Sequence, residues 1–252
     1  MQENYHFMTP DDDFDSRLSK LKTMIDNAGH IVFFGGAGVS TESGIPDFRS
    51  KDGLYNKKFK NLAPEYLLSD ACLNHEPKLF YEFYKTKLDC RDARPSTAHK
   101  YLAELEKTKR VSIITQNIDG LHQKAGSSEV YEIHGSIMRN FCTKCCRQFD
   151  ENAVFDSAEP IPKCPGCSGG FIRPDIVLYG EQLPDDFEKA MSVTENADLM
   201  IVAGTSLTVY PAANIVRIFE GKLVIINRDC TNMDKRADII FHESIGDVFK
   251  KL

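Results

Sequence analysis

The sequence predicts an α/β protein with a parallel sheet covered by helices on both faces, together with a second, smaller domain. Three observations predict this fold class. Short apolar runs typical of strands alternate with helical runs along most of the chain. The first apolar run ends in a glycine-rich turn, and two Cys-x-x-Cys pairs lie in a separate stretch between residues 141 and 171.

The elements follow one another in a regular order. Leu18, Leu21 and Ile25 stand at helical spacing, and Gly29 ends that run, so a helix is expected over 14–28. Residues 60–90 are expected to be helical, with Pro77 in a first turn. The remaining expected helices cover 97–107, 184–194, 212–219 and the C-terminal end. Strands are expected over 31–34, 111–115, 130–133, 199–203, 223–226 and 239–241, and residues 176–179 should be extended.

The glycine turn after the first strand has the composition of a phosphate cradle. Gly36 and Gly38 match the first two glycines of the dinucleotide fingerprint Gly-x-Gly-x-x-Gly, whereas Thr41 stands at the third. A helix start is expected near 39–43, where backbone N–H groups would favour an anion. The turn indicates a Rossmann-like domain, although a glycine turn without a ligand has the same appearance.

Small and polar residues follow the other expected strands as well. In an open parallel sheet, ligands bind beyond the carboxyl ends of the strands. Agreement among five strand ends therefore favours a dinucleotide site over a set of unrelated caps and turns. The residues placed there are Gly36, Ala37, Gly38, Thr115, Gln116, Asn117, Asp119, His134, Gly204, Thr205, Ser206 and Asn227.

The cysteines indicate a metal site. Cys142 and Cys145 form one pair, Cys164 and Cys167 form another, and 18 residues separate the pairs. This spacing is a strong zinc signature, and four thiolates leave no open coordination position, so the Zn²⁺ is expected to be structural. Cys146 is a fifth thiol beside the site that does not keep the spacing.

Composition and charge exclude several classes of function. The chain has 252 residues and a net charge of −6, which argues against direct nucleic-acid binding. No apolar run approaches the ~18 residues of a membrane span, and the N-terminus lacks the features of a signal peptide. The expected location is the cytoplasm, with no membrane partner.

Several motifs together resemble those of the sirtuins, the NAD-dependent protein deacylases, and especially the bacterial protein deacetylases. The resemblance runs from about residue 14 to the C-terminus. It rests on Gly-Ala-Gly-Val-Ser-Thr-Glu-Ser-Gly-Ile-Pro-Asp-Phe-Arg at 36–49, Thr-Gln-Asn-Ile-Asp at 115–119, Ile-His-Gly at 133–135, the four cysteines, Gly-Thr-Ser-Leu at 204–207 and Ile-Asn at 226–227.

The resemblance implies a role for each matching residue. His134 would be the general base and Asn117 would act with it. The NAD⁺ contacts would be Ala37, Thr41, Phe48, Arg49, Gln116, Asn117, Ile118, Asp119, His134, Thr205, Ser206, Asn227 and Ile245. Val177, Leu178 and Tyr179 would pair with a peptide carrying acetyl-lysine, as an added strand. NAD⁺ would be consumed, with release of nicotinamide and O-acetyl-ADP-ribose.

The resemblance also implies a division of the chain. A discontinuous NAD-binding domain would comprise 14–58, 95–137 and 176–252. A helical insertion at 59–94 and a zinc-binding module at 138–175 would form the small domain, which is therefore expected to be a zinc-ribbon and helical domain.

The chain departs from the family pattern in places that leave alternatives open. Gly35 stands where a threonine is more usual. Before Gly180-Glu181, the dipeptide Leu178-Tyr179 replaces the more usual dipeptide, which contains phenylalanine. Tyr84 and Lys87 resemble the Tyr-x-x-Arg pair of members that prefer acidic acyl groups, but lysine lacks arginine's bidentate fork. Deacetylation is expected; a deacylase for longer or acidic acyl groups and a mono-ADP-ribosyltransferase are the alternatives. A zinc-ribbon binding module and a dehydrogenase are less favoured.

Overall fold

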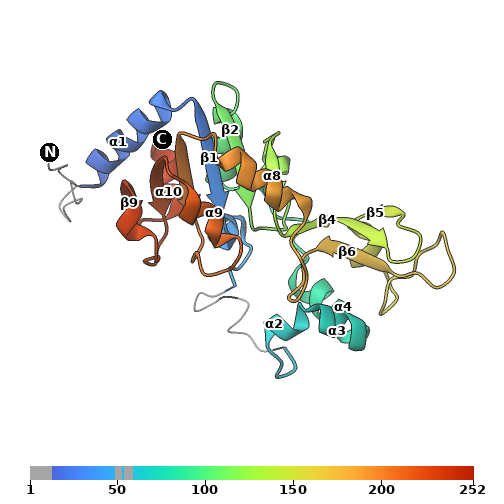
Figure 1. Cartoon of the computed structure of the whole chain (residues 1–252). Coiled ribbons are helices and arrows are strands. Elements are labelled where there is room, and N and C mark those ends of the chain that lie inside the picture. Colours follow the sequence, from blue (N-terminus) through green and yellow to red (C-terminus); the bar gives the residue numbers. More distant parts are fainter. Residues whose placement is uncertain (1–12, 49–52, 54–58) are drawn as a thin grey trace.

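A computed structural model describes residues 13–48, 53 and 59–252, and it contains a six-stranded parallel sheet with the order β3-β2-β1-β7-β8-β9 (Figure 1). The strand order reverses between β1 and β7, which is where doubly wound sheets bind their ligands. The strands are β1 (His30–Gly35), β2 (Arg110–Thr115), β3 (Val130–Glu132), β7 (Leu199–Ala203), β8 (Lys222–Ile226) and β9 (Ile239–Phe241).

Helices cover both faces of this sheet because alternate residues of its buried strands point to opposite sides. Ile31 and Phe33 of β1 pack in one apolar cluster with α1 (Phe14–Asn27), α5 (Thr97–Leu105) and α10 (Ile245–Lys251). Val32 and Phe34 pack in the other with α8 (Asp185–Thr194) and α9 (Ala213–Ile218). The expected α/β layering is confirmed.

The smaller part of the protein lies to one side of the parallel sheet (Figure 1). It combines α2 (Pro64–Leu67), α3 (Asp70–His75) and α4 (Pro77–Lys87) with an antiparallel sheet of order β5-β4-β6. Its strands are β4 (Gly135–Cys142), β5 (Gln148–Asp150) and β6 (Ile172–Ile176), and α7 (Asn152–Phe155) follows β5. One apolar cluster joins the helices and the sheet.

Four local expectations differ from the structure. The turn after β1 continues as a 3₁₀ helix, η1 (Ala37–Ser43). Residues 60–90 contain three separate helices, and Pro77 does occupy the first turn of the third. The helix expected over 212–219 is shorter, because α9 covers only Ala213–Ile218. Strand β6 ends at Ile176, so 177–179 continue only as irregular extended chain.

Two further segments are short. Helix α6 (Leu121–Ala125) follows β2, and the 3₁₀ helix η3 (Asp234–Arg236) connects β8 to β9. Among the helices in the described part of the chain, none has the length and apolar character that crossing a membrane requires.

Candidate active site

The carboxyl ends of the parallel strands are level with one another. Gly35 of β1 pairs with Thr115 of β2 on one side and with Ala203 of β7 on the other. Ala203 pairs in turn with Ile226 of β8. The residues that follow these strands therefore start from one edge of the sheet, which is why segments far apart in the sequence meet there.

The glycine turn after β1 lies in backbone contact with the turn after β7. The Gly38 N–H donates to the Gly204 carbonyl oxygen at 2.9 Å. A Cβ at Gly36 would stand 2.7 Å from that oxygen, and one at Gly38 would stand 2.6 Å from the Gly204 Cα. Gly204 itself has a φ of +62°, which a side chain disfavours. The three glycines let two strand ends approach closely and form the floor of a cavity.

A cavity of about 1380 Å³ opens at this edge and extends to the smaller part of the protein. It exceeds the usual size of a small-molecule site, so it has room for a dinucleotide and for part of a second substrate. Every described residue to which the resemblance gives an NAD⁺, catalytic or peptide-binding role lines it: Ala37, Thr41, Phe48, Gln116, Asn117, Ile118, Asp119, His134, Val177, Leu178, Tyr179, Thr205, Ser206, Asn227 and Ile245. Thr115, which was also expected at this edge, does not line the cavity. Arg49 lies outside the described residues.

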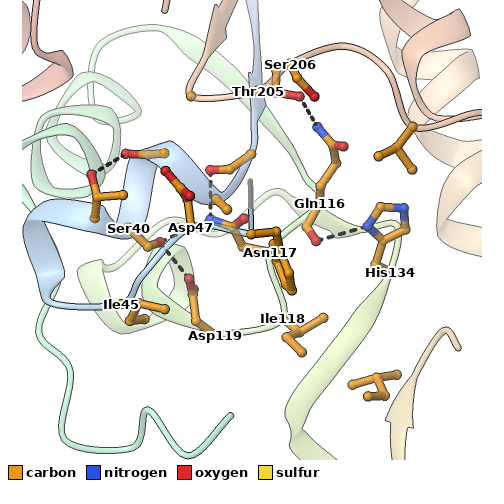
Figure 2. Close-up of a pocket in the computed structure, with 18 of the residues that line it drawn as sticks. Ser40, Ile45, Asp47, Gln116, Asn117, Ile118, Asp119, His134, Thr205 and Ser206 are labelled. Carbon is orange, nitrogen blue, oxygen red and sulfur yellow. Dashed lines mark hydrogen bonds between the residues drawn. The ribbon is translucent and has the colours of Figure 1, made fainter. Parts of the chain in front are cut away.

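Gln116 connects two parts of this lining (Figure 2). Its side-chain Nε2 donates to Thr205 Oγ1 at 3.0 Å, and its backbone carbonyl lies 3.0 Å from Nδ1 of His134. Because a carbonyl can only accept, Nδ1 carries the proton and Nε2 keeps a free lone pair. Burial lowers the pKa of His134, so the neutral imidazole is favoured.

A buried chain of hydrogen bonds runs from Asn117 through Ser40 to Asp119. Asn117 Nδ2 donates to Ser40 Oγ at 3.1 Å and to the Gly36 carbonyl at 3.1 Å. Ser40 Oγ in turn donates to Asp119 Oδ2 at 2.6 Å (Figure 2). Burial raises the pKa of Asp119, whereas the Ser40 bond acts in the opposite direction. The chain holds the amide and the carboxyl at fixed positions in the cavity wall.

Some lining residues were not predicted from the sequence. Ser40 lies within the glycine motif, but nothing local marks it as the partner of a carboxylate 79 positions away. Glu42 accepts from the Gly246 N–H at 2.9 Å and so ties η1 to α10, beside Ile245. Ile45 and Asp47 also line the cavity, as does Lys87, which the sequence pattern had singled out.

Tyr84, the partner of Lys87 in the sequence pattern, does not line the cavity. It is fully buried and stacked between Phe80 and Phe155, with ring-centroid distances of 5.8 and 5.1 Å.

The segment predicted to contact the peptide, 177–179, has all three of its backbone N–H groups in use. Val177 N–H donates to the His134 carbonyl and Tyr179 N–H to the Leu68 carbonyl, both at 2.9 Å. Leu178 N–H donates to the side chain of Glu181 at 2.9 Å. A carboxylate on a side chain can move away more readily than a backbone carbonyl, so Leu178 offers the N–H that an added strand could take over.

The four motif cysteines come together in the smaller part of the protein. Their sulfurs lie within 4.8 Å of one another, with Cys142 to Cys167 at 3.5 Å and Cys145 to Cys164 at 3.7 Å. Four ligands at Zn–S distances of about 2.3 Å stand roughly 3.8 Å apart in a tetrahedron, so the residues fit zinc. The N–H groups of Cys145 and Lys144 lower the pKa of Cys142 and favour its thiolate, whereas the hydrogen bond with Cys142 raises the pKa of Cys167.

Comparison with known proteins agrees with this geometry. Residues 36–211 match the model of the Sir2 family. The chain belongs to the Sir2 family. A Clostridium perfringens member named NAD-dependent protein deacetylase is 48% identical over 94% of this chain and 99% of its own length. A Staphylococcus aureus (strain Mu50) member of the same name is 43% identical over 93% and 97%.

Solved Sir2 structures share the fold throughout. A complex of Sir2 with a p53 peptide and NAD⁺ has a TM-score of 0.83 and 35% identity, covering 93% of this chain and 96% of that one. Sir2 bound to an acetylated peptide has a TM-score of 0.82 and 33% identity with the same coverage. The family therefore accounts for both the parallel sheet and the cysteine-bearing part of this chain.

Proposed function

We propose that this Sir2 family member is an NAD-dependent protein-lysine deacetylase that transfers the acetyl group of acetyl-lysine to ADP-ribose. NAD⁺ is consumed as a co-substrate, and Zn²⁺ has a structural role. The observation that supports this function best is the placement of His134, Asn117 and Asp119 around one cavity with the two glycine turns. Two relatives that match this chain over nearly their whole length are named NAD-dependent protein deacetylase.

The glycine turns suit the phosphates of the co-substrate. Gly36, Gly38 and Gly204 leave the backbone bare, so an anion can approach its N–H groups closely. Thr205 and Ser206 would add hydroxyl groups, Asn227 would contact a ribose and Ile245 would contact adenine. Bound NAD⁺ supplies an activated ribose carbon and a leaving group, nicotinamide.

His134 would act at the reacting end as the general base. Its Nδ1 proton is held by the Gln116 carbonyl, so Nε2 is the nitrogen that can accept a proton from a ribose hydroxyl. Asn117 and Asp119 would orient the ribose and the carboxamide, because the Ser40 bonds fix both side chains. Phe48 and Arg49 would cover the ribose and exclude water.

The acetyl-lysine peptide would lie along Val177, Leu178 and Tyr179, taking over the Leu178 N–H from Glu181. Of the two residues that would recognise an acidic acyl group, only Lys87 reaches the cavity, since Tyr84 is enclosed by aromatic rings. This favours acetyl over acidic acyl groups.

We also propose a division of the chain into two domains. Residues 14–58, 95–137 and 176–252 would form the NAD-binding domain, and residues 59–94 and 138–175 would form the small domain. We propose the cytoplasm as the location of the protein, with no direct binding of nucleic acid.

The decisive experiment is mass spectrometry of the products formed from NAD⁺ and a panel of acetyl, longer-acyl and succinyl peptides. Equal amounts of nicotinamide, free lysine peptide and O-acetyl-ADP-ribose are expected, with the acetyl peptide turned over fastest. Labelled protein formed from labelled NAD⁺ without loss of an acyl group would instead identify an ADP-ribosyltransferase. Faster turnover of the succinyl peptide would overturn the acetyl preference.

A further inference from the structure

A second group of metal-ligating side chains lies outside the four-cysteine cluster. Cys230, Asp234 and His242 each place one ligand atom within 4.8 Å of the other two. They come from the connection after β8, from the start of η3 and from the residue after β9. The β8–β9 connection and the residue after β9 thus meet at the carboxyl end of the last two strands of the parallel sheet, near β9 in Figure 1.

One hydrogen bond orients the exposed imidazole of His242. Its Nδ1 lies 2.9 Å from the backbone carbonyl of Asn227, so Nδ1 donates and Nε2 keeps its lone pair. Histidines that bind metals in proteins nearly always use the second ring nitrogen in this way, which fixes both tautomer and ring direction. The Asn227 backbone is itself held, because its N–H donates to the Phe241 carbonyl at 2.9 Å.

The carboxylate of Asp234 is held from behind by Thr231. Its Oδ1 accepts from the Thr231 N–H at 3.1 Å and from the Thr231 hydroxyl at 2.5 Å. These bonds occupy Oδ1 and orient the group, leaving Oδ2 for a ligand. Hydrogen-bonded carboxylates of this kind are the usual supporting arrangement around a bound metal ion. Cys230 is exposed, so its thiol can adjust its position at little cost.

We propose that Cys230, Asp234 and His242 bind one divalent ion of the zinc class. A thiolate, an imidazole and a carboxylate form a donor set that suits Zn²⁺ and Co²⁺, whereas Mg²⁺ and Ca²⁺ require oxygen ligands. Ligand atoms of one tetrahedral ion lie roughly 3.3–3.8 Å apart, so the three side chains need only a small inward movement. Three protein ligands leave the fourth position to water.

The ion would lie at the rim of the cavity. Asn227, Arg228, Asp229 and Cys230 all line that cavity, and the ion would fasten the connection that carries them to the end of β9. Binding of the ion needs no step of the deacetylase reaction, so it can be measured without NAD⁺ or peptide. The result of that measurement does not depend on whether the proposed activity is correct.

The test is a titration of the full chain, purified with the four-cysteine zinc retained, with Co²⁺ as a spectroscopic substitute for zinc. One further equivalent of cobalt is expected to bind, with the near-ultraviolet charge-transfer band of a cobalt–thiolate bond. Cys230→Ser is expected to remove the band. His242→Ala and Asp234→Asn are expected to weaken binding at least ~10-fold, and Thr231→Val about 10-fold through the lost support of Asp234.

Two matched variants distinguish this site from others. Cys146→Ser removes another exposed thiol, and His75→Ala removes another exposed imidazole; both should bind the additional cobalt as the unaltered chain does. Absence of a further equivalent of cobalt would overturn the proposal. So would a charge-transfer band that survives in Cys230→Ser, because the cobalt would then have entered the four-cysteine site, or unaltered affinity in His242→Ala.

Discussion

Nδ1 of His134 lies 3.0 Å from the carbonyl oxygen of Gln116, and this contact decides which ring nitrogen is available for chemistry. The same Gln116 reaches Thr205 through its side chain, at the end of a different strand. Gln116 therefore links His134, the proposed general base, to Thr205 in the turn after β7. Because this contact uses the backbone carbonyl of Gln116, it does not depend on the Gln116 side chain.

Replacing His134 with alanine should lower kcat for deacetylation by about 10²–10⁴-fold, the usual contribution of a general base. NAD⁺ binding should change little, because the cradle of glycine turns is untouched. Nicotinamide release and NAD⁺ titration measure the two effects separately. His75→Ala, an exposed histidine on α3, is the control, and full activity in His134→Ala would remove the histidine from the mechanism.

The pH dependence of the reaction follows from the burial of His134. Burial disfavours the imidazolium, so the pKa of the free enzyme's base lies below its ordinary value of about 6.5. The base works in its neutral form, and activity should therefore persist below that pH before it falls in acid. A profile of kcat/KM against pH measures this acidic limb. A limb centred well above pH ~6.5 would contradict the assignment.

Ser40→Ala should weaken both the protein and its NAD⁺ site. The substitution removes the hydroxyl that donates to Asp119 and accepts from Asn117, so a buried carboxyl loses a hydrogen bond worth about 1–3 kcal/mol. Urea unfolding should show that loss, and the KM for NAD⁺ should rise. Ser127→Ala is the matched control, since the buried Ser127 hydroxyl has no hydrogen-bond partner among the described residues. Equal effects of the two substitutions would argue against the role of Ser40.

The parallel sheet and its strand ends could be predicted from sequence because the relevant signals are local. Each buried strand is a short apolar run, and the carboxyl ends of parallel strands lie at one edge of a sheet. The observed register places Gly35, Thr115 and Ala203 level at that edge. The antiparallel sheet was not predicted. Its strand β4 shifts register between Ser136 and Asn140, and no alternating pattern survives that irregularity. The Ser40–Asp119 bond also escaped prediction, because it depends on how two distant turns pack.

Cys164→Ser should cost zinc and stability together. The four sulfurs lie between β4 and the segment leading to β6, so the ion fastens a part of the protein that has only a small sheet of its own. Metal content should fall and thermal unfolding should occur at a lower temperature. Cys146→Ser is the control, because that neighbouring thiol is exposed and does not belong to the cluster. A zinc-free variant that unfolds like the unaltered chain would refute the structural role.

A pair of buried histidines should make the fold sensitive to acid. His99 and His122 lie with their ring centroids 4.5 Å apart, and neither Nε2 atom has a partner among the described residues. Burial lowers the pKa of His99 to about 4 and that of His122 well below its ordinary value. Both rings are neutral in the folded protein at pH 7, but in the unfolded chain they take up protons below pH ~6.5.

Stability should therefore be complete above about pH 6.5 and should decline as the pH falls towards 4, because only the unfolded state binds these protons. At pH ~5.5 the loss should be on the order of 1 kcal/mol for each ring. His122→Leu removes one titrating group and fills the space with an apolar side chain, so its loss between pH ~7.5 and ~5.5 should be smaller by about that amount. Urea unfolding at the two pH values measures the difference, with His75→Ala as the exposed control. If His122→Leu and the unaltered chain lost the same stability on acidification, burial of the neutral pair would not be the cause.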